Sequence, residues 1–85
     1  MKSFDYTIKD ELGLHARPAG ALSKKTAAYQ SEITLTTKGK TVNAKRLFAI
    51  MSLAVKKGDE ITLSFEGPDE EAACAESKAF CEENF

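Results

Sequence analysis

Residues Glu60–Glu66 read EITLSFE and carry the clearest secondary-structure pattern in the sequence. Apolar side chains occupy every second position of this stretch, at Ile61, Leu63 and Phe65, and polar ones stand between them. Because successive side chains of a strand point to opposite faces, the alternation predicts a strand with one buried and one solvated face. Strands of this kind build antiparallel sheets that are covered on one side only.

Similar alternation predicts the other strands. One is expected over about residues 3–8, and a second runs through Ile33 and Leu35. The sequence TKGK at residues 37–40 is typical of a tight turn, and a short strand with Val42 follows it. The strand with Ile33 and Leu35 and the strand with Val42 are therefore expected to form a hairpin.

Three segments have helical spacing. An amphipathic helix is expected over about residues 16–28, and a short one near 46–53. A third helix begins after Gly67 with acidic residues, which favour the positive end of a helix, and runs to about residue 83. Its inner face is expected to consist of Ala73, Cys74, Ser77 and Cys81.

The order of elements is therefore β-α-β-β-α-β-α. Residues 1–85 contain no internal repeat or Pro/Gly/Ser-rich linker, so we expect a single domain. Four strands that each bury one face need the helices to cover that face. This favours a two-layer α+β fold, with an antiparallel sheet whose other face is open to water.

Composition excludes several functions. With 42% hydrophobic residues, 29% charged residues and a formal net charge of −1, the chain has no overall basic field for nucleic acid. No apolar run approaches the length of a membrane span and the first residues do not resemble a signal peptide, so we expect a cytoplasmic protein without membrane insertion. A single histidine leaves no set of metal ligands, and Cys74 and Cys81 are expected to be buried thiols.

The sequence GLHARPA at residues 13–19 contains the only histidine, His15. It lies just before a predicted helix, and Pro18 falls in the first turn, where a missing N–H is tolerated. The amides of Ala16 and Arg17 are then free to bind an anion. The positive helix end also disfavours a protonated imidazole, and Arg17 can donate paired hydrogen bonds to phosphate oxygens.

Two interpretations of His15 remain open on the residues alone. The ring is either a structural residue at a helix start or a nucleophile that accepts a phosphoryl group. The short second helix raises a similar choice, because it cannot bury Leu47, Phe48, Ile50 and Met51 on one side. Either all four lie in the core, or the exposed ones form a docking surface, with Lys45 and Arg46 placed for a partner.

Four motifs together resemble the HPr family, the histidine-containing phosphocarriers of the bacterial phosphoenolpyruvate-dependent sugar phosphotransferase system. They are residues 13–19 (GLHARPA), 43–45 (NAK), 51–53 (MSL) and 57–63 (KGDEITL). The resemblance spans essentially the whole chain. It implies an open-faced β-sandwich with sheet order 1-4-2-3 and three helices on one face.

The resemblance also implies a function. His15 would accept a phosphoryl group on Nδ1 from phosphorylated enzyme I and pass it to sugar-specific IIA domains. Arg17 and the amide of Ala16 would bind the phosphate, and the partner surface would consist of Gly20, Leu47, Phe48 and Met51. A monomeric carrier, rather than an enzyme, is implied, without cofactor or metal. The alternative is a regulatory binding module that acts through its phosphohistidine state or serves a paralogous phosphotransferase branch.

One departure from the family concerns regulation. Many members carry a regulatory serine at the position of Arg46. Arginine has no hydroxyl group to phosphorylate, so we expect the serine switch to be absent here.

Overall fold

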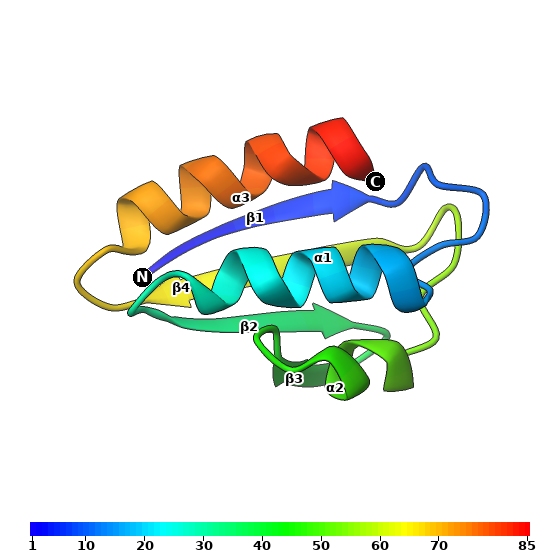
Figure 1. Cartoon of the computed structure of the whole chain (residues 1–85), viewed down its shortest axis with the longest axis horizontal. Helices are drawn as coiled ribbons and strands as arrows, with labels where there is room; N and C mark the ends of the chain where they lie inside the picture. The colour runs from blue at the N-terminus through cyan, green and yellow to red at the C-terminus, as the bar shows by residue number, and fades with distance from the viewer.

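The computed structural model describes all residues, 1–85, as a four-stranded antiparallel sheet with three helices packed on one face (Figure 1). The elements in chain order are β1 (Lys2–Thr7), α1 (Ala16–Ala27), β2 (Glu32–Thr37), β3 (Lys40–Asn43), α2 (Leu47–Ser52), β4 (Glu60–Glu66) and α3 (Glu70–Asn84). The predicted order of elements and the α+β fold class are therefore confirmed. None of the helices is both long and apolar enough to cross a membrane.

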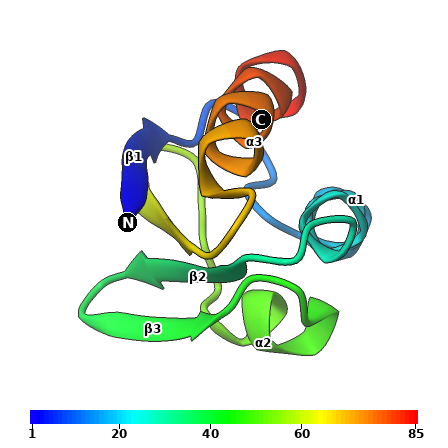
Figure 2. The same ribbon diagram turned by 90° about the vertical axis from the view of Figure 1, so that its left-hand side faces the viewer.

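Strand β4, the EITLSFE stretch, lies inside the sheet. The strand order is β1-β4-β2-β3, as the resemblance implied, and β4 pairs antiparallel with both β1 and β2. Leu63 at its centre stands opposite Phe4 on one side and Leu35 on the other. All three helices lie on the same side of the sheet (Figure 2). As a result, β1, the first element, lies on the same half of the sheet as α3, the last element, which packs against β1 and β4.

The core lies between the sheet and the helices. The apolar residues of β2 and β4 are buried there, together with side chains from α1, α2 and α3. Strand β1 lies at the edge of the sheet, so Phe4 and Tyr6 are only half-buried, and the Phe4 ring stacks on that of Phe65. The opposite face of the sheet is polar, because Thr34, Thr36, Thr62 and Ser64 alternate with the buried residues.

Helix α3 buries three of its four predicted inner residues, namely Ala73, Ser77 and Cys81. The prediction that both thiols are buried is wrong for Cys74, which is half-buried. Cys74 follows Ala73 directly, so it lies about 100° around the helix axis from that residue, at the border of the buried stripe. Desolvation, with a smaller contribution from Glu82, raises the pKa of the Cys81 thiol to about 12, so this cysteine stays protonated and unreactive.

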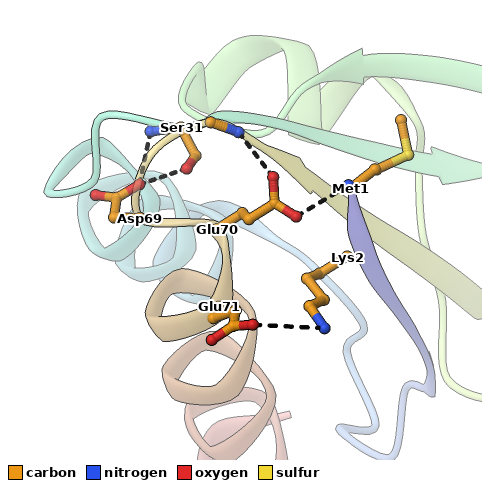
Figure 3. A network of polar contacts seen from close by, with 7 residues as sticks. Met1, Lys2, Ser31, Asp69, Glu70 and Glu71 are labelled. Carbon is orange, nitrogen blue, oxygen red and sulfur yellow. Dashed lines mark hydrogen bonds and ion pairs between the residues drawn. The ribbon is translucent and has the colours of Figure 1, made fainter.

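The start of α3 is tied to the connection between α1 and β2 by Asp69 (Figure 3). Its carboxylate accepts hydrogen bonds from the Ser31 hydroxyl, from the Ser31 amide at 2.9 Å and from the Gln30 amide at 2.8 Å. These donors, the Ser31 hydroxyl first, lower the pKa of Asp69 below its ordinary value of 3.8. The ionised carboxylate therefore stabilises this junction.

The neighbouring acidic residues of α3 contact strand β1 (Figure 3). Glu70 forms a 2.9 Å ion pair with the amino group of Met1 and accepts a 3.2 Å hydrogen bond from the Gly67 amide. Glu71 lies 3.8 Å from the Lys2 ammonium group. The acidic first turn of α3 therefore does more than favour the helix dipole, because it also pairs with the positive charges of Met1 and Lys2.

Candidate functional site

His15 is the residue that caps the N-terminus of α1. Its backbone is extended (φ −79°, ψ −170°), and its carbonyl accepts the Ala19 amide at 2.9 Å. The imidazole makes no capping hydrogen bond and is partly exposed. The predicted place of His15 at a helix start is therefore confirmed, and its ring nitrogens are not engaged by the helix that it begins.

The first turn of α1 presents free amide donors. Ala16 and Arg17 are exposed, and their N–H groups have no acceptor in the protein. Pro18, which has no N–H, is buried against the core. No acidic side chain stands in this turn to occupy the amides. The helix end beside His15 therefore has the donors and the partial positive charge that favour an anion.

The loop between β1 and α1 is tightly held. Asp10 organises its turn, because its side chain accepts the Leu12 amide at 2.9 Å and its carbonyl accepts the Gly13 amide at 3.0 Å. Gly13 has a positive φ of 68°, and the buried Leu14 donates its amide to the Val55 carbonyl at 3.0 Å. The residue before His15 is thus fixed to the loop between α2 and β4.

His15 lies between two shallow pockets. One, of about 270 Å³, separates it from Met51 and the residues that follow α2, Ala54–Lys56. The other, of about 310 Å³, is lined by His15, Arg17 and residues at the end of α3. A group attached to the imidazole therefore has open space on both sides, and Arg17 lines one of them.

Helix α2 divides its apolar residues between core and surface. Ile50 is buried and Leu47 is half-buried, whereas Phe48 is 81% exposed and Met51 is 36% exposed. This confirms that a two-turn helix leaves some of the cluster in solvent. Gly20 faces this helix from α1, and a Cβ atom built on it would only touch Leu47 Cδ1, at 3.9 Å.

The two basic residues before α2 differ in their surroundings. Arg46 is exposed and caps the helix with its carbonyl, which accepts the Ile50 amide at 3.1 Å. Lys45 is half-buried, and its ammonium group donates to the Tyr29 carbonyl at 2.8 Å. The prediction that both are placed for a partner is therefore wrong for Lys45, which joins α2 to the end of α1.

Leu12 also lies at this site, although it is not among the residues predicted from the sequence. Its side chain is 72% exposed and lines both pockets beside His15. A large apolar residue within a turn, next to a glycine, is a signal that could have identified it, because such a residue contributes little to the core. Exposed apolar side chains therefore occur both in the β1–α1 loop, at Leu12, and on α2, at Phe48 and Met51.

Charge is distributed unevenly along the chain, which the net charge alone does not reveal. A net charge of −1 conceals nine basic and one acidic residue within residues 12–57, against nine acidic and one basic residue within 58–85. The basic residues belong to α1, the β2–β3 turn and the segments around α2, whereas the acidic ones are concentrated on α3.

Nowhere do three histidine, cysteine or carboxylate side chains gather closely enough to hold a metal ion.

Comparison with known proteins decides the family. A family model described as "PTS HPr component phosphorylation site" matches residues 2–83. The chain is also 41% identical over 85 residues to a protein of Mycoplasma genitalium named phosphocarrier protein HPr, covering 99% of this chain and 97% of the relative. The chain belongs to the HPr family.

Solved structures of HPr proteins share the fold. HPr-C-His from Thermoanaerobacter tengcongensis superposes with a TM-score of 0.92 at 40% identity, covering 96% of this chain and 92% of that one. A structure described as an HPr dimer from the same organism has a TM-score of 0.77, also at 40% identity, and covers 98% and 95% of the two chains. The expectation of a monomer therefore stays a prediction.

HPr membership establishes that the chain is a phosphocarrier of the phosphotransferase system. It favours the carrier over the alternative of a regulatory module, because the matched relative is named a phosphocarrier.

Proposed function

We propose that this HPr protein accepts a phosphoryl group on His15 from phosphorylated enzyme I and donates it to IIA domains. The observation that carries the proposal is the free imidazole at the N-terminus of α1, next to two amides without protein acceptors. A ring nitrogen forms a bond to phosphorus as the bond between phosphorus and the donor breaks. In the onward transfer, the bond between nitrogen and phosphorus breaks as phosphorus forms a bond to the acceptor in the IIA domain.

Arg17 and the helix end supply the electrostatics of this step. The amides of Ala16 and Arg17 and the Arg17 guanidinium stabilise the charge on the phosphoryl oxygens during transfer. Because phosphoryl transfer depends mainly on positioning and charge stabilisation, such a site needs a partner to complete it. The protein is therefore a carrier whose chemistry occurs within complexes, rather than an enzyme, and the site needs neither a cofactor nor a metal of its own.

The partner surface consists of Gly20, Leu47, Phe48 and Met51, to which we add Leu12. Its centre is apolar, and the surrounding segments supply most of the basic residues of the chain. We therefore infer that enzyme I and the IIA domains present an apolar patch with an acidic rim. The acidic α3 would be repelled by that rim, which favours approach by the face that carries His15.

We propose separately that the start of α2 carries no phosphorylation switch. Arg46 is exposed there and has no hydroxyl group, so transfer through His15 is not controlled by phosphorylation at this position. A positive charge at this place adds to the basic rim of the partner surface. Phosphorylation of the chain by a serine kinase at residue 46 is accordingly not expected.

Relay assays test the proposed function. The protein is first phosphorylated with enzyme I and labelled phosphoenolpyruvate, freed of enzyme I, and then mixed with a panel of IIA domains. We expect the label to pass to at least one IIA domain and to be absent throughout for His15→Ala. Label that enters the wild-type protein but passes to no IIA domain would contradict the carrier role.

A further inference from the structure

Lys38 connects the turn between β2 and β3 to the loop between α2 and β4. Its ammonium nitrogen lies 3.0 Å from Oδ2 of Asp59 and donates to the carbonyl oxygen of Ala54 at 3.3 Å. The two acceptors stand near opposite ends of this loop, which spans residues 53–59. One side chain therefore holds the loop at two points.

The loop contains a strained residue. Ala54 has a positive φ of 51°, a left-handed conformation that is unfavourable for any residue with a Cβ atom. Such a conformation persists only where the surrounding structure holds it. Of its two backbone polar groups, the Ala54 amide donates to the Met51 carbonyl at 3.1 Å and the carbonyl accepts from Lys38. Lys38 thus binds the strained residue directly.

Asp59 completes this arrangement from the other end of the loop. Its Oδ2 atom accepts the Lys56 amide at 2.8 Å in addition to the Lys38 ammonium group. The Lys56 amide, followed by Lys38, lowers the pKa of the Asp59 carboxyl group below its ordinary value, so the carboxylate stays ionised near neutral pH. We name the Lys38–Asp59 ion pair, with its hydrogen bonds to Ala54 and Lys56, the loop clamp.

The clamped loop forms one wall of the His15 site. Ala54–Lys56 line the pocket on the Met51 side of His15, and the Val55 carbonyl accepts the Leu14 amide. At its other end the loop binds the start of the His15 loop through two backbone hydrogen bonds. The Ile8 amide donates to the Asp59 carbonyl at 2.9 Å, and the Gly58 amide donates to the Ile8 carbonyl at 2.8 Å. The segment that carries His15 is therefore attached at both ends to the loop that Lys38 holds.

We propose that Lys38 and Asp59 are positioning residues for His15, acting through the loop clamp on the Val55–Leu14 hydrogen bond. The side chains of Lys38 and Asp59 are 49% and 27% exposed, and exposed ion pairs contribute little to the stability of a fold. We therefore expect their effect on the geometry of the site, because the loop that they hold contacts the His15 segment at Leu14 and Ile8. This inference rests on the proposed function, because it names residues that prepare His15 for phosphoryl transfer.

Two variants and a matched control test the loop clamp. Lys38→Met and Asp59→Asn each remove one charge and keep the approximate size of the side chain. Lys38 itself has a positive φ of 52°, and methionine is as unbranched as lysine there. Lys78→Met is the control, because Lys78 is exposed on α3, away from the basic segments around the partner surface. Lys38→Arg retains a donor and is the variant expected to restore function.

Each protein is measured by hydrogen exchange of the Leu14 amide and by kcat/KM as an acceptor from phosphorylated enzyme I. We expect Lys38→Met and Asp59→Asn to speed Leu14 exchange by about tenfold and to lower kcat/KM by about 3- to 10-fold. The double variant should be no worse than either single one, since both break the same unit. Lys78→Met should match the wild type, and Lys38→Arg should recover most of the loss.

The two readouts separate the possible failures. If wild-type protein accepts no phosphate, the proposed function fails, while Leu14 exchange still reports whether the clamp holds the loop. If the wild type is phosphorylated and both readouts are unchanged in Lys38→Met, the clamp is overturned. Faster Leu14 exchange with unchanged transfer would overturn the positioning role, and slower transfer with unchanged exchange would overturn its route through Val55 and Leu14.

Discussion

A Cβ atom on Gly13 would lie 2.1 Å from the carbonyl oxygen of Val55, far inside van der Waals contact. The two loops that frame His15 therefore touch backbone to backbone. The neighbouring Leu14 amide uses this approach to donate to the same carbonyl. The place of His15 thus depends on a residue without a side chain two positions before it.

Gly13→Ala is expected to destabilise the fold strongly. The positive φ of 68° and the contact with Val55 both oppose a Cβ atom, so the free energy of unfolding should fall by about 2–5 kcal/mol. Gly39→Ala is the matched control, because Gly39 also has a positive φ but open space around it, and should cost about 1–2 kcal/mol. Urea denaturation measures both, and equal losses would argue against the close approach.

Arg17→Ala is expected to slow phosphoryl transfer without affecting the fold. The side chain is exposed, so the free energy of unfolding should change by less than about 0.5 kcal/mol. Loss of a charge-assisted contact to phosphate should cost about 1.5–3 kcal/mol, or about 10- to 150-fold in kcat/KM. Lys78→Ala removes an exposed charge of α3, away from the partner surface, and serves as the control. Wild-type transfer rates in Arg17→Ala would exclude its phosphate role.

Phe48→Ala is expected to weaken the complex with enzyme I. An aromatic side chain that is 81% exposed contributes little to the core, so stability should stay near that of the wild type. If Phe48 enters a pocket of the partner, its truncation should raise Kd by about 5- to 30-fold. Calorimetric titration measures this, with Lys78→Ala on α3 as a control. An unchanged Kd would place the docking surface elsewhere.

Asp69 is expected to make folding stability depend on acid pH. Its folded pKa is lowered by the Ser31 hydroxyl and the Gln30 amide, so its stabilising effect is present above the ordinary carboxyl pKa and is lost as pH falls through the folded pKa. The stability difference between wild type and Asp69→Asn should therefore shrink between about pH 5 and about pH 2. Asp59 and Glu70 also have lowered pKa values but occur in both proteins. A difference independent of pH would disprove the linkage.

Local patterns predicted most of the fold. The expected strand at residues 60–66 coincides with β4, and the short helix expected near 46–53 corresponds to Leu47–Ser52. Alternation and helical spacing depend on which face is buried, and a two-layer fold buries one face of every element. For the same reason, the place of His15 at the start of α1 could be predicted from the residues that follow it.

Features that depend on long-range contacts could not be predicted. Nothing near Ala54 in the sequence indicates a left-handed backbone, because the group that holds its carbonyl, Lys38, is sixteen residues away. Lys45 resembles a partner-facing cation until the Tyr29 carbonyl is brought beside it.

The most direct measurement is the mass of the protein after incubation with phosphoenolpyruvate and enzyme I, followed by mapping of the modified residue. We expect the addition of one acid-labile phosphate, located on His15 in the wild type and absent from His15→Ala. An unchanged wild-type mass, or equal phosphorylation of His15→Ala, would contradict the claim that His15 carries the phosphoryl group.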